Sequence, residues 1–294
     1  MKKTIIFLLP ILSLLAFFVF RSQPSETLPA IIPLPSSPSS PAPVIDTLDK
    51  ITYQDQVFHF AWVKLDDLTN LHLYPNFQAQ SSTQELINQK NCSILINGGF
   101  YGQDDQPIGW LVSQGQLISQ PVKSRLLNGY LSLINGQATI SPVRPQTPVT
   151  LGLQSGPLLV FDQKPLILKI KDDQSRRRLI AGQTNNNELI FLAIVGPDSL
   201  FTGPLLADTP AAVMAIAEKI GETLTTAFNL DGGSASAFYT SDIYLEEFSW
   251  IASYFCYLEY SLANSCNSKR VAQGVSSSSS ILYFSITSVI NSLN

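Results

Sequence analysis

The sequence is organised around the stretch Phe228-Asn229-Leu230-Asp231-Gly232-Gly233-Ser234, an apolar run that stops at a carboxylate followed by two glycines. Residues 210–223 before it have a helix-like pattern, so we expect Asp231 to lie where a short buried strand ends in a turn. An ionised carboxylate is costly to bury without partners, while paired glycines allow a backbone or a ligand to come close. The stretch therefore predicts a functional site at Asp231, with a simple tight turn as the alternative.

A second stretch has the same construction. It reads Ser93-Ile94-Leu95-Ile96-Asn97-Gly98-Gly99-Phe100-Tyr101, an apolar strand followed by an amide, two glycines and two aromatic residues. Ligands in α/β architectures gather beyond the carboxyl ends of strands. We therefore expect Asn97 and Asp231 on two walls of one cleft, although each stretch alone is also compatible with a structural turn.

The remaining patterns predict a strand-rich fold. Short-period mixing of apolar and polar residues predicts strands over 57–65 and 71–75. Further strand candidates are 108–112, 116–119, 129–134, 137–140, 158–161 and 189–195. A turn at 68–70 would join the first two strands, and Asn135-Gly136 is a hairpin signal. The pattern favours an α+β (mixed α/β) class, in a strand-rich single domain with few helices.

Two helices are expected within this domain. The first covers residues 82–88, and the second covers 210–223. Thr209 is the expected N-cap of the second helix, and Pro210 suits its first turn.

The N-terminal segment indicates export. Lys2 and Lys3 precede an uncharged run over residues 5–20, so residues 1–21 are interpreted as a signal peptide or a membrane anchor, both of which stay open. Residues 22–48 form a linker rich in Pro and Ser. The folded domain, 49–248, would then be periplasmic or extracellular, either secreted or tethered to the membrane through residues 5–20.

Residues 249–294 have a composition unlike the rest of the chain, with five consecutive serines before an apolar end. We interpret them as an atypical tail. It is either a lineage-specific, poorly ordered extension or the product of an altered reading frame.

Composition excludes several function classes. Charged residues are 14% of the chain and its net charge is −4, which argues against nucleic-acid binding. Cys92, Cys256 and Cys266 have no CxxC spacing, which argues against a zinc site; a bridge between the last two is one option. His59 and His72 both lie in expected strands, where a structural role is favoured over catalysis. Oxygen ligands leave a divalent cation such as calcium open.

Two further stretches carry polar groups to strand ends. Gln154-Ser155-Gly156-Pro157-Leu158 places a hydroxyl and a Gly-Pro turn before a strand, where a free backbone N–H can face an anion. Arg176-Arg177-Arg178 opens another apolar run, and arginine matches phosphate oxygens bidentately. We interpret the first two arginines as solvated charges balanced by Asp172 and Asp173, and Arg178 as the functional candidate.

The order of these motifs resembles the phosphodiester glycosidase family, which includes the lysosomal uncovering enzyme and bacterial exported relatives. The motifs are Asn-Gly-Gly-Phe-Tyr (97–101), Ser-Gly-Pro-Leu-Leu-Val (155–160), Arg178 followed by Ala-Gly-Gln-Thr (181–184), and Asn-Leu-Asp-Gly-Gly-Ser (229–234). The resemblance covers about residues 50–240. It implies a hydrolase that cleaves the bond between an anomeric carbon and a phosphodiester.

The resemblance also implies the site residues. Asp231 would stabilise an oxocarbenium-like centre, act as nucleophile or activate water, while Arg178 and backbone donors near Gly156 would hold the phosphate. Asn97 and Ser155 would orient sugar or phosphate. Further substrate-binding positions would be Gly98, Gly99, Phe100, Tyr101, Gly156, Thr184, Gly232, Gly233 and Ser234.

The chain departs from the family pattern at two of these motifs. Ser234 replaces a third glycine, and Arg-Arg-Arg-Leu stands where Arg-Thr is usual. The alternative function is a non-catalytic cell-envelope module that binds glycans or phosphorylated polymers, and a third is a structural anchor. An isolated carboxylate beside a phosphate site favours the enzyme.

Overall fold

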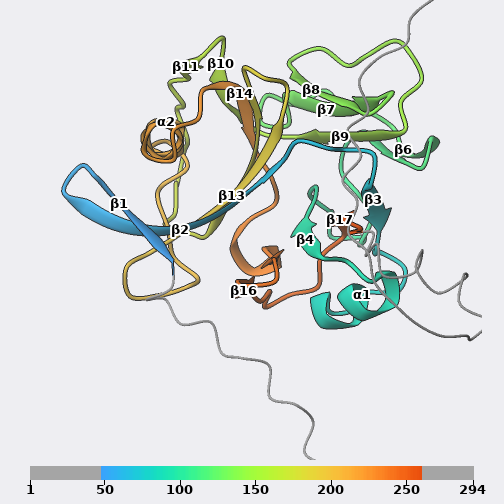
Figure 1. Cartoon of the computed structure of the whole chain (residues 1–294), viewed down its shortest axis with the longest axis horizontal. Coiled ribbons are helices and arrows are strands. Elements are labelled where there is room, and N and C mark those ends of the chain that lie inside the picture. Colours follow the sequence, from blue (N-terminus) through green and yellow to red (C-terminus); the bar gives the residue numbers. More distant parts are fainter. Residues whose placement is uncertain (1–47, 260–294) are drawn as a thin grey trace, which may run out of the picture. The chain divides into compact units, whose positions relative to one another are not determined.

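The computed structural model describes residues 48–259, which form three antiparallel sheets and two α-helices (Figure 1). Every pairing between the described strands is antiparallel. The expected strand-rich fold with few helices is therefore confirmed as α+β, without the parallel sheet that a mixed α/β fold carries.

The largest sheet has seven strands in the order β1-β2-β13-β12-β14-β10-β11. Its strands are β1 (Asp49–Tyr53), β2 (Gln56–Leu65), β10 (Leu158–Phe161), β11 (Lys164–Pro165), β12 (Arg178–Thr184), β13 (Leu189–Val195) and β14 (Leu224–Asn229).

The other two sheets have five strands each. One has the order β16-β15-β4-β17-β3, and the other has the order β6-β5-β9-β7-β8. The strands of the first are β3 (Leu71–Pro75), β4 (Ile94–Asn97), β15 (Phe238–Tyr239), β16 (Tyr244–Leu245) and β17 (Ser253–Tyr257). Those of the second are β5 (Leu111–Ser113), β6 (Gln116–Ser119), β7 (Gly129–Ile134), β8 (Gln137–Ser141) and β9 (Leu151–Ser155).

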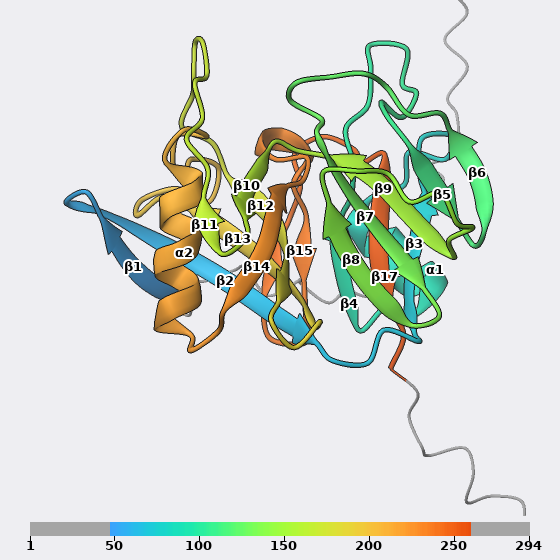
Figure 2. The same ribbon diagram turned by 90° about the horizontal axis from the view of Figure 1, so that it is seen from above.

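Strand β13 shows why the large sheet is buried on both faces. Its alternate residues Leu189, Phe191, Ala193 and Val195 face a core shared with the two smaller sheets. The residues between them pack on the other face with Val213 and Ile216 of α2 (Thr209–Lys219). Figure 2 shows the seven-stranded sheet with α2 on one side and β7, β8 and β9 on the other. An uninterrupted apolar strand is what this two-sided burial requires.

Both expected helices occur, but their first and last residues differ from the predicted ones. Helix α1 (Thr83–Lys90) is capped by Ser82, whose side chain exchanges hydrogen bonds with Glu85 in a capping box. Helix α2 ends at Lys219 rather than 223, and its N-cap is Asp208, not Thr209, which already belongs to the helix. The chain can start strand β14 at Leu224 because the helix has ended before it.

The sequence predicted local turns well, but it did not predict which strands pair with each other. The Asn135-Gly136 hairpin between β7 and β8 is confirmed. The turn at 68–70 also forms, yet β2 and β3 enter different sheets instead of pairing with each other. Alternation fixes the existence of a strand, whereas its partner depends on which core its apolar face joins.

The boundary at 248 is too early. Strand β17 lies inside a sheet, where it pairs with β3 on one side and β4 on the other. Tyr254 and Phe255 are fully buried there, so residues up to Tyr257 belong to the fold. The interpretation of residues 260–294 as a tail falls outside the described residues. The same holds for the predicted signal or anchor and most of the linker, over residues 1–47. Within 48–259, no helix is long and apolar enough to span a membrane.

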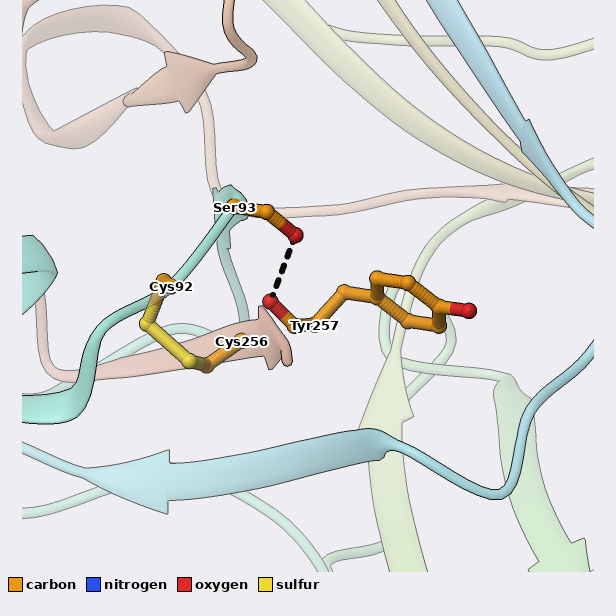
Figure 3. Close-up of a disulfide and its surroundings, with 4 residues drawn as sticks. All are labelled: Cys92, Ser93, Cys256 and Tyr257. Atoms are coloured by element: carbon orange, nitrogen blue, oxygen red, sulfur yellow. Dashed lines mark hydrogen bonds between the residues drawn. A yellow bond between two sulfur atoms is a disulfide. The ribbon is translucent and has the colours of Figure 1, made fainter. Parts of the chain in front are cut away.

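A disulfide ties β17 to the start of β4 (Figure 3). It joins Cys92 and Cys256, whose Cα atoms are 5.3 Å apart, so the bridge to Cys266 considered from the sequence is wrong. Beside it, the Ser93 hydroxyl donates to the carbonyl of Tyr257 over 3.0 Å. The bridge spans 164 residues of sequence and thereby links the last strand to the segment between α1 and β4.

Candidate functional site

A cavity of about 540 Å³ opens where the ends of strands from all three sheets come together. Its walls are the segment after β4, the loop before β7, the β9–β10 turn, the start of β12, the approach to α2 and the turn after β14. The lining residues are Phe100, Tyr101, Ile108, Ser124, Leu126, Leu127, Gly156, Pro157, Arg176, Arg178, Leu206, Asn229, Asp231, Gly232, Gly233 and Ser234.

The ends of β4 and β14 are joined by direct hydrogen bonds. The Asn97 side chain donates to the carbonyl of Asp231 over 2.8 Å, and the N–H of Asp231 donates to the carbonyl of Gly98 over 3.1 Å. The Asn97 Oδ1 accepts from the N–H of Ala237 over 3.1 Å. The expectation that the two stretches meet is therefore confirmed, but between strands of two antiparallel sheets. Asn97 itself is buried and holds the turn rather than facing the cavity.

Asp231 brings an unusual carboxyl to the cavity. Its side chain is half-buried, and this burial raises its pKa from 3.8 to about 7, with a hydrogen bond from the Gly232 N–H opposing part of the rise. Asp231 is the only carboxylate among the described residues that line the cavity. A group with a pKa near neutrality can take up or release a proton under ordinary conditions, as acid–base chemistry requires.

Arg178 brings a fixed positive charge to the same cavity. Its Nε donates to the carbonyl of Pro204 over 3.0 Å, and its Nη2 donates to the carbonyl of Gln174 over 2.6 Å. Nη2 also pairs with the Asp173 carboxylate over 3.4 Å. Burial lowers the pKa of Arg178, which the nearby Asp173 opposes, and arginine stays protonated in either case. The guanidinium is thus anchored on one side while it lines the cavity.

The three consecutive arginines divide between two sides of the chain. Arg176 and Arg178 both line the cavity, whereas Arg177 faces away from it and is 1% exposed. Such alternation is typical of extended backbone. The interpretation of Arg177 as a solvated charge is therefore wrong. Its guanidinium donates to three backbone carbonyls, those of Leu200 at 2.6 Å, Ser236 at 2.8 Å and Glu246 at 2.8 Å.

Arg177 also fixes the turn that carries Asp231. Its carbonyl accepts from the N–H of Gly233 over 3.0 Å. A Cβ at Gly232 would lie 2.7 Å from the same oxygen, closer than the backbone can accommodate. Glycine at this position therefore lets the turn pack against the start of β12, so the two arginines of the cavity wall and Asp231 are held together.

The Gly156-Pro157 turn carries the chain from β9 in a five-stranded sheet into β10 of the seven-stranded sheet. Its backbone is not a free donor, because the Gly156 N–H donates to the carbonyl of Asn229 over 2.9 Å. The Ser155 hydroxyl donates to that same carbonyl over 2.8 Å. The expected anion-binding N–H at this turn is therefore wrong, because these groups are used to hold Asn229.

Eight of the predicted site residues line the cavity and five do not. Those that line it are Phe100, Tyr101, Gly156, Arg178, Asp231, Gly232, Gly233 and Ser234. Those outside the lining are Asn97, Gly98, Gly99, Ser155 and Thr184. Thr184 lies at the far end of β12, where its hydroxyl accepts from the N–H groups of Asn186 and Glu188.

Several lining residues were missed. They are Ile108, Ser124, Leu126, Leu127, Pro157, Arg176, Leu206 and Asn229. Asn229 had a usable signal in the sequence, because it lies only two residues before Asp231. Its Oδ1 is buried without a hydrogen-bond partner among the described residues. Leu126, Leu127 and Leu206 lie outside helices and strands, so no hydrophobic periodicity in the sequence could have predicted that they line the cavity.

The histidines do not contribute to the cavity lining. His59 is buried in β2, and the ring of His72 stacks on Tyr74 with centroids 5.6 Å apart. Within residues 48–259, no group of three or more His, Cys, Asp or Glu side chains is arranged to hold a metal ion.

Comparison with known proteins identifies a matching protein family and solved structures with a similar fold. Residues 90–272 match the family model described as phosphodiester glycosidase. A search of curated protein sequences finds no significant match.

Two solved structures are similar. The catalytic domain of zebrafish N-acetylglucosamine-1-phosphodiester alpha-N-acetylglucosaminidase, auto-inhibited by its pro-peptide, aligns with a TM-score of 0.56 at 14% identity, over 72% of this chain and 82% of that chain. A hypothetical protein from Synechocystis aligns with a TM-score of 0.52 at 12% identity, over 71% of this chain and 61% of that chain. At these identities the likeness shows a shared fold.

Proposed function

The chain belongs to the phosphodiester glycosidase family, and on that premise we propose that it hydrolyses the bond between the anomeric carbon of a sugar and a phosphodiester. The observation that carries this proposal is Asp231, a half-buried carboxyl with a pKa raised to about 7, in one cavity with Arg176 and Arg178. The arginines suit the phosphate, and the carboxyl supplies the chemistry.

In the proposed reaction, ionised Asp231 takes a proton from a water molecule whose oxygen attacks the anomeric carbon. The bond from that carbon to the phosphate oxygen breaks, and the phosphate leaves with the bonding electrons as a phosphomonoester of the aglycone. Phosphate is a weakly basic leaving group that needs little protonation, so one carboxyl suffices. This fits a cavity lining in which Asp231 is the only carboxylate among the described residues.

The remaining residues divide into contact and positioning roles. We assign phosphate binding to Arg178 and Arg176, and packing against the sugar to Phe100 and Tyr101 beside Asp231. Asn97 is a positioning residue, because it holds the carbonyl of Asp231 and does not line the cavity. Ser155 has the same role toward the carbonyl of Asn229.

The disulfide supports export of the protein. Disulfides persist in oxidising compartments outside the cytoplasm. The bridge between Cys92 and Cys256 therefore agrees with residues 1–21 acting as a signal or anchor and residues 22–48 as a spacer. We propose a periplasmic or extracellular location, with a catalytic domain from residue 49 to at least Tyr257.

Turnover by the full-length protein tests the function. The substrate is an N-acetylglucosamine-1-phosphodiester, chosen from the name of the zebrafish relative, and the released phosphomonoester is the product measured. Wild type should release the phosphomonoester, and Asp231→Asn should lose at least about a hundredfold in kcat. Asp242→Asn, at an exposed position, is the matched control and should keep wild-type turnover. Parallel reactions with calcium and with a chelator test whether a hard cation takes part.

Product stereochemistry separates two roles for Asp231. A base that activates water inverts the anomeric configuration, whereas a nucleophile retains it. Binding of the substrate without turnover by wild type would instead favour the non-catalytic envelope module.

A further inference from the structure

The cavity lining combines charged, aromatic and aliphatic side chains. The Asp231 N–H donates to the carbonyl of Gly98, so the aromatic residues that follow, Phe100 and Tyr101, line the wall next to the carboxyl. Leu206 lies beside Arg178, because its N–H donates over 3.0 Å to Asp173, the partner of that arginine.

A second apolar wall is built by the loop before β7. The carbonyl of Leu126 approaches Gly156 so closely that a Cβ at Gly156 would lie 2.2 Å from it. Gly156 has a φ of +149°, and both features exclude other residues here. Leu126 and Leu127 therefore line the cavity over the β9–β10 turn.

This loop is held in place from inside the protein. The Gln154 side chain accepts from the N–H of Val122 over 3.0 Å and donates to the carbonyls of Val122 at 2.7 Å and Leu127 at 2.8 Å. The Ser124 hydroxyl accepts from the N–H groups of Leu126 and Leu127. Leu126, which is 53% exposed, is thus presented by a fixed backbone at the cavity mouth.

The position of the reacting bond indicates which part of the substrate these leucines would contact. With the anomeric carbon at Asp231 and the phosphate at Arg178, the group on the far side of the phosphate is the aglycone. Resting on the proposed function, we infer that the cavity takes a sugar-1-phosphodiester whose aglycone is a hydrocarbon chain, packed against Leu126, Leu127 and Leu206. The substrate class is therefore a lipid-linked sugar phosphodiester.

The magnitude of the effect follows from burial of methylene groups. Each methylene removed from water contributes about 0.8 kcal/mol, or roughly fourfold in binding. Lengthening the aglycone from methyl to butyl therefore raises kcat/KM by at least about tenfold, even when only part of the chain is covered. A polar aglycone of the same size gains nothing from the leucines.

The test uses the full-length protein and the methyl, butyl and octyl phosphodiesters of N-acetylglucosamine-1-phosphate, below their micellar concentrations. Leu126→Ser should reduce the octyl-to-methyl ratio of kcat/KM at least about threefold. Leu117→Ser is the matched control, because Leu117 is 51% exposed and outside the cavity lining, and should leave the ratio unchanged. Thermal melts confirm that both variants fold.

Equal kcat/KM for the methyl and octyl esters in wild type would overturn the inference and leave the proposed hydrolysis standing. If none of the three esters is turned over, the proposed function fails, and calorimetric titration with the same esters then decides the inference. Tighter binding of the octyl ester that depends on Leu126 supports it, and equal affinities refute it.

Discussion

The side-chain amide of Asn97 donates to the main-chain carbonyl of Asp231 over 2.8 Å, which fastens the end of β4 to the turn after β14. Two sheets thus meet at the carboxyl proposed to act. The bond lies behind Asp231 rather than in the cavity, so its role is to fix where the carboxyl points.

Asn97→Ala should therefore reduce both stability and activity. Removing the amide leaves the carbonyl of Asp231 and the N–H of Ala237 without this partner, at a cost of about 1–3 kcal/mol. Denaturant unfolding and kcat measure the two effects. Asn88→Ala, at an exposed position of α1, is the control and should change neither. Full activity in folded Asn97→Ala would contradict the positioning role.

Asp231→Asn should stabilise the protein at alkaline pH. The pKa of Asp231 rises from 3.8 to about 7 on folding, so its contribution to stability is full below pH 3.8 and is lost as pH rises through about 7. An amide does not ionise, so at about pH 8 the variant should gain on the order of a few kcal/mol over wild type.

Thermal melts from about pH 4 to pH 8 measure this gain. The two proteins should have similar melting temperatures at the acid end and separate as pH rises. A constant difference across the range would show that the burial of Asp231 does not destabilise its ionised form.

Replacement by lysine should destabilise the protein at Arg177 but leave its stability nearly unchanged at Arg176. Lysine cannot reproduce the three donations of the buried Arg177, so Arg177→Lys should cost about 2–4 kcal/mol of stability. Arg176 is exposed at the cavity, so Arg176→Lys should change stability by less than about 0.5 kcal/mol and raise KM. Equal stability of the two variants would contradict this division.

A chain that ends at residue 248 should not fold. It lacks β17, which pairs with two strands, and Cys256 of the disulfide. The double variant Cys92→Ser, Cys256→Ser keeps the strand and should lose about 2–5 kcal/mol. Circular dichroism and denaturant unfolding separate the two cases, and a cooperative transition in the truncated chain would contradict the assignment of β17 to the fold.

Strand positions were predictable because alternation and short apolar runs are local properties of the sequence. The runs that became β7, β8, β10 and β13 were all identified, and the hairpin at Asn135-Gly136 follows from its turn residues. The assignment of strands to sheets was not predictable, as β2 and β3 show. The strand β17 was missed because its aromatic residues stand next to a tail of different composition.

The candidate site shows the same limit. Asp231 and Arg178 were found because motifs place them at strand ends. Leu127 and Leu206 were missed because their positions depend on hydrogen bonds to Gln154 and Asp173, residues far away in the sequence. The different surroundings of Arg176 and Arg177 also come from tertiary packing, since the two residues are adjacent and chemically identical.

The dependence of kcat/KM on pH tests the central claim most directly. If ionised Asp231 is the base, hydrolysis of a sugar-1-phosphodiester by wild type should rise with pH through about 7 and then level off, following the raised pKa of this carboxyl. Asp231→Asn should lose this limb together with its activity. A rate that is independent of pH across this range, or an Asp231→Asn variant that retains the wild-type profile, would contradict the account.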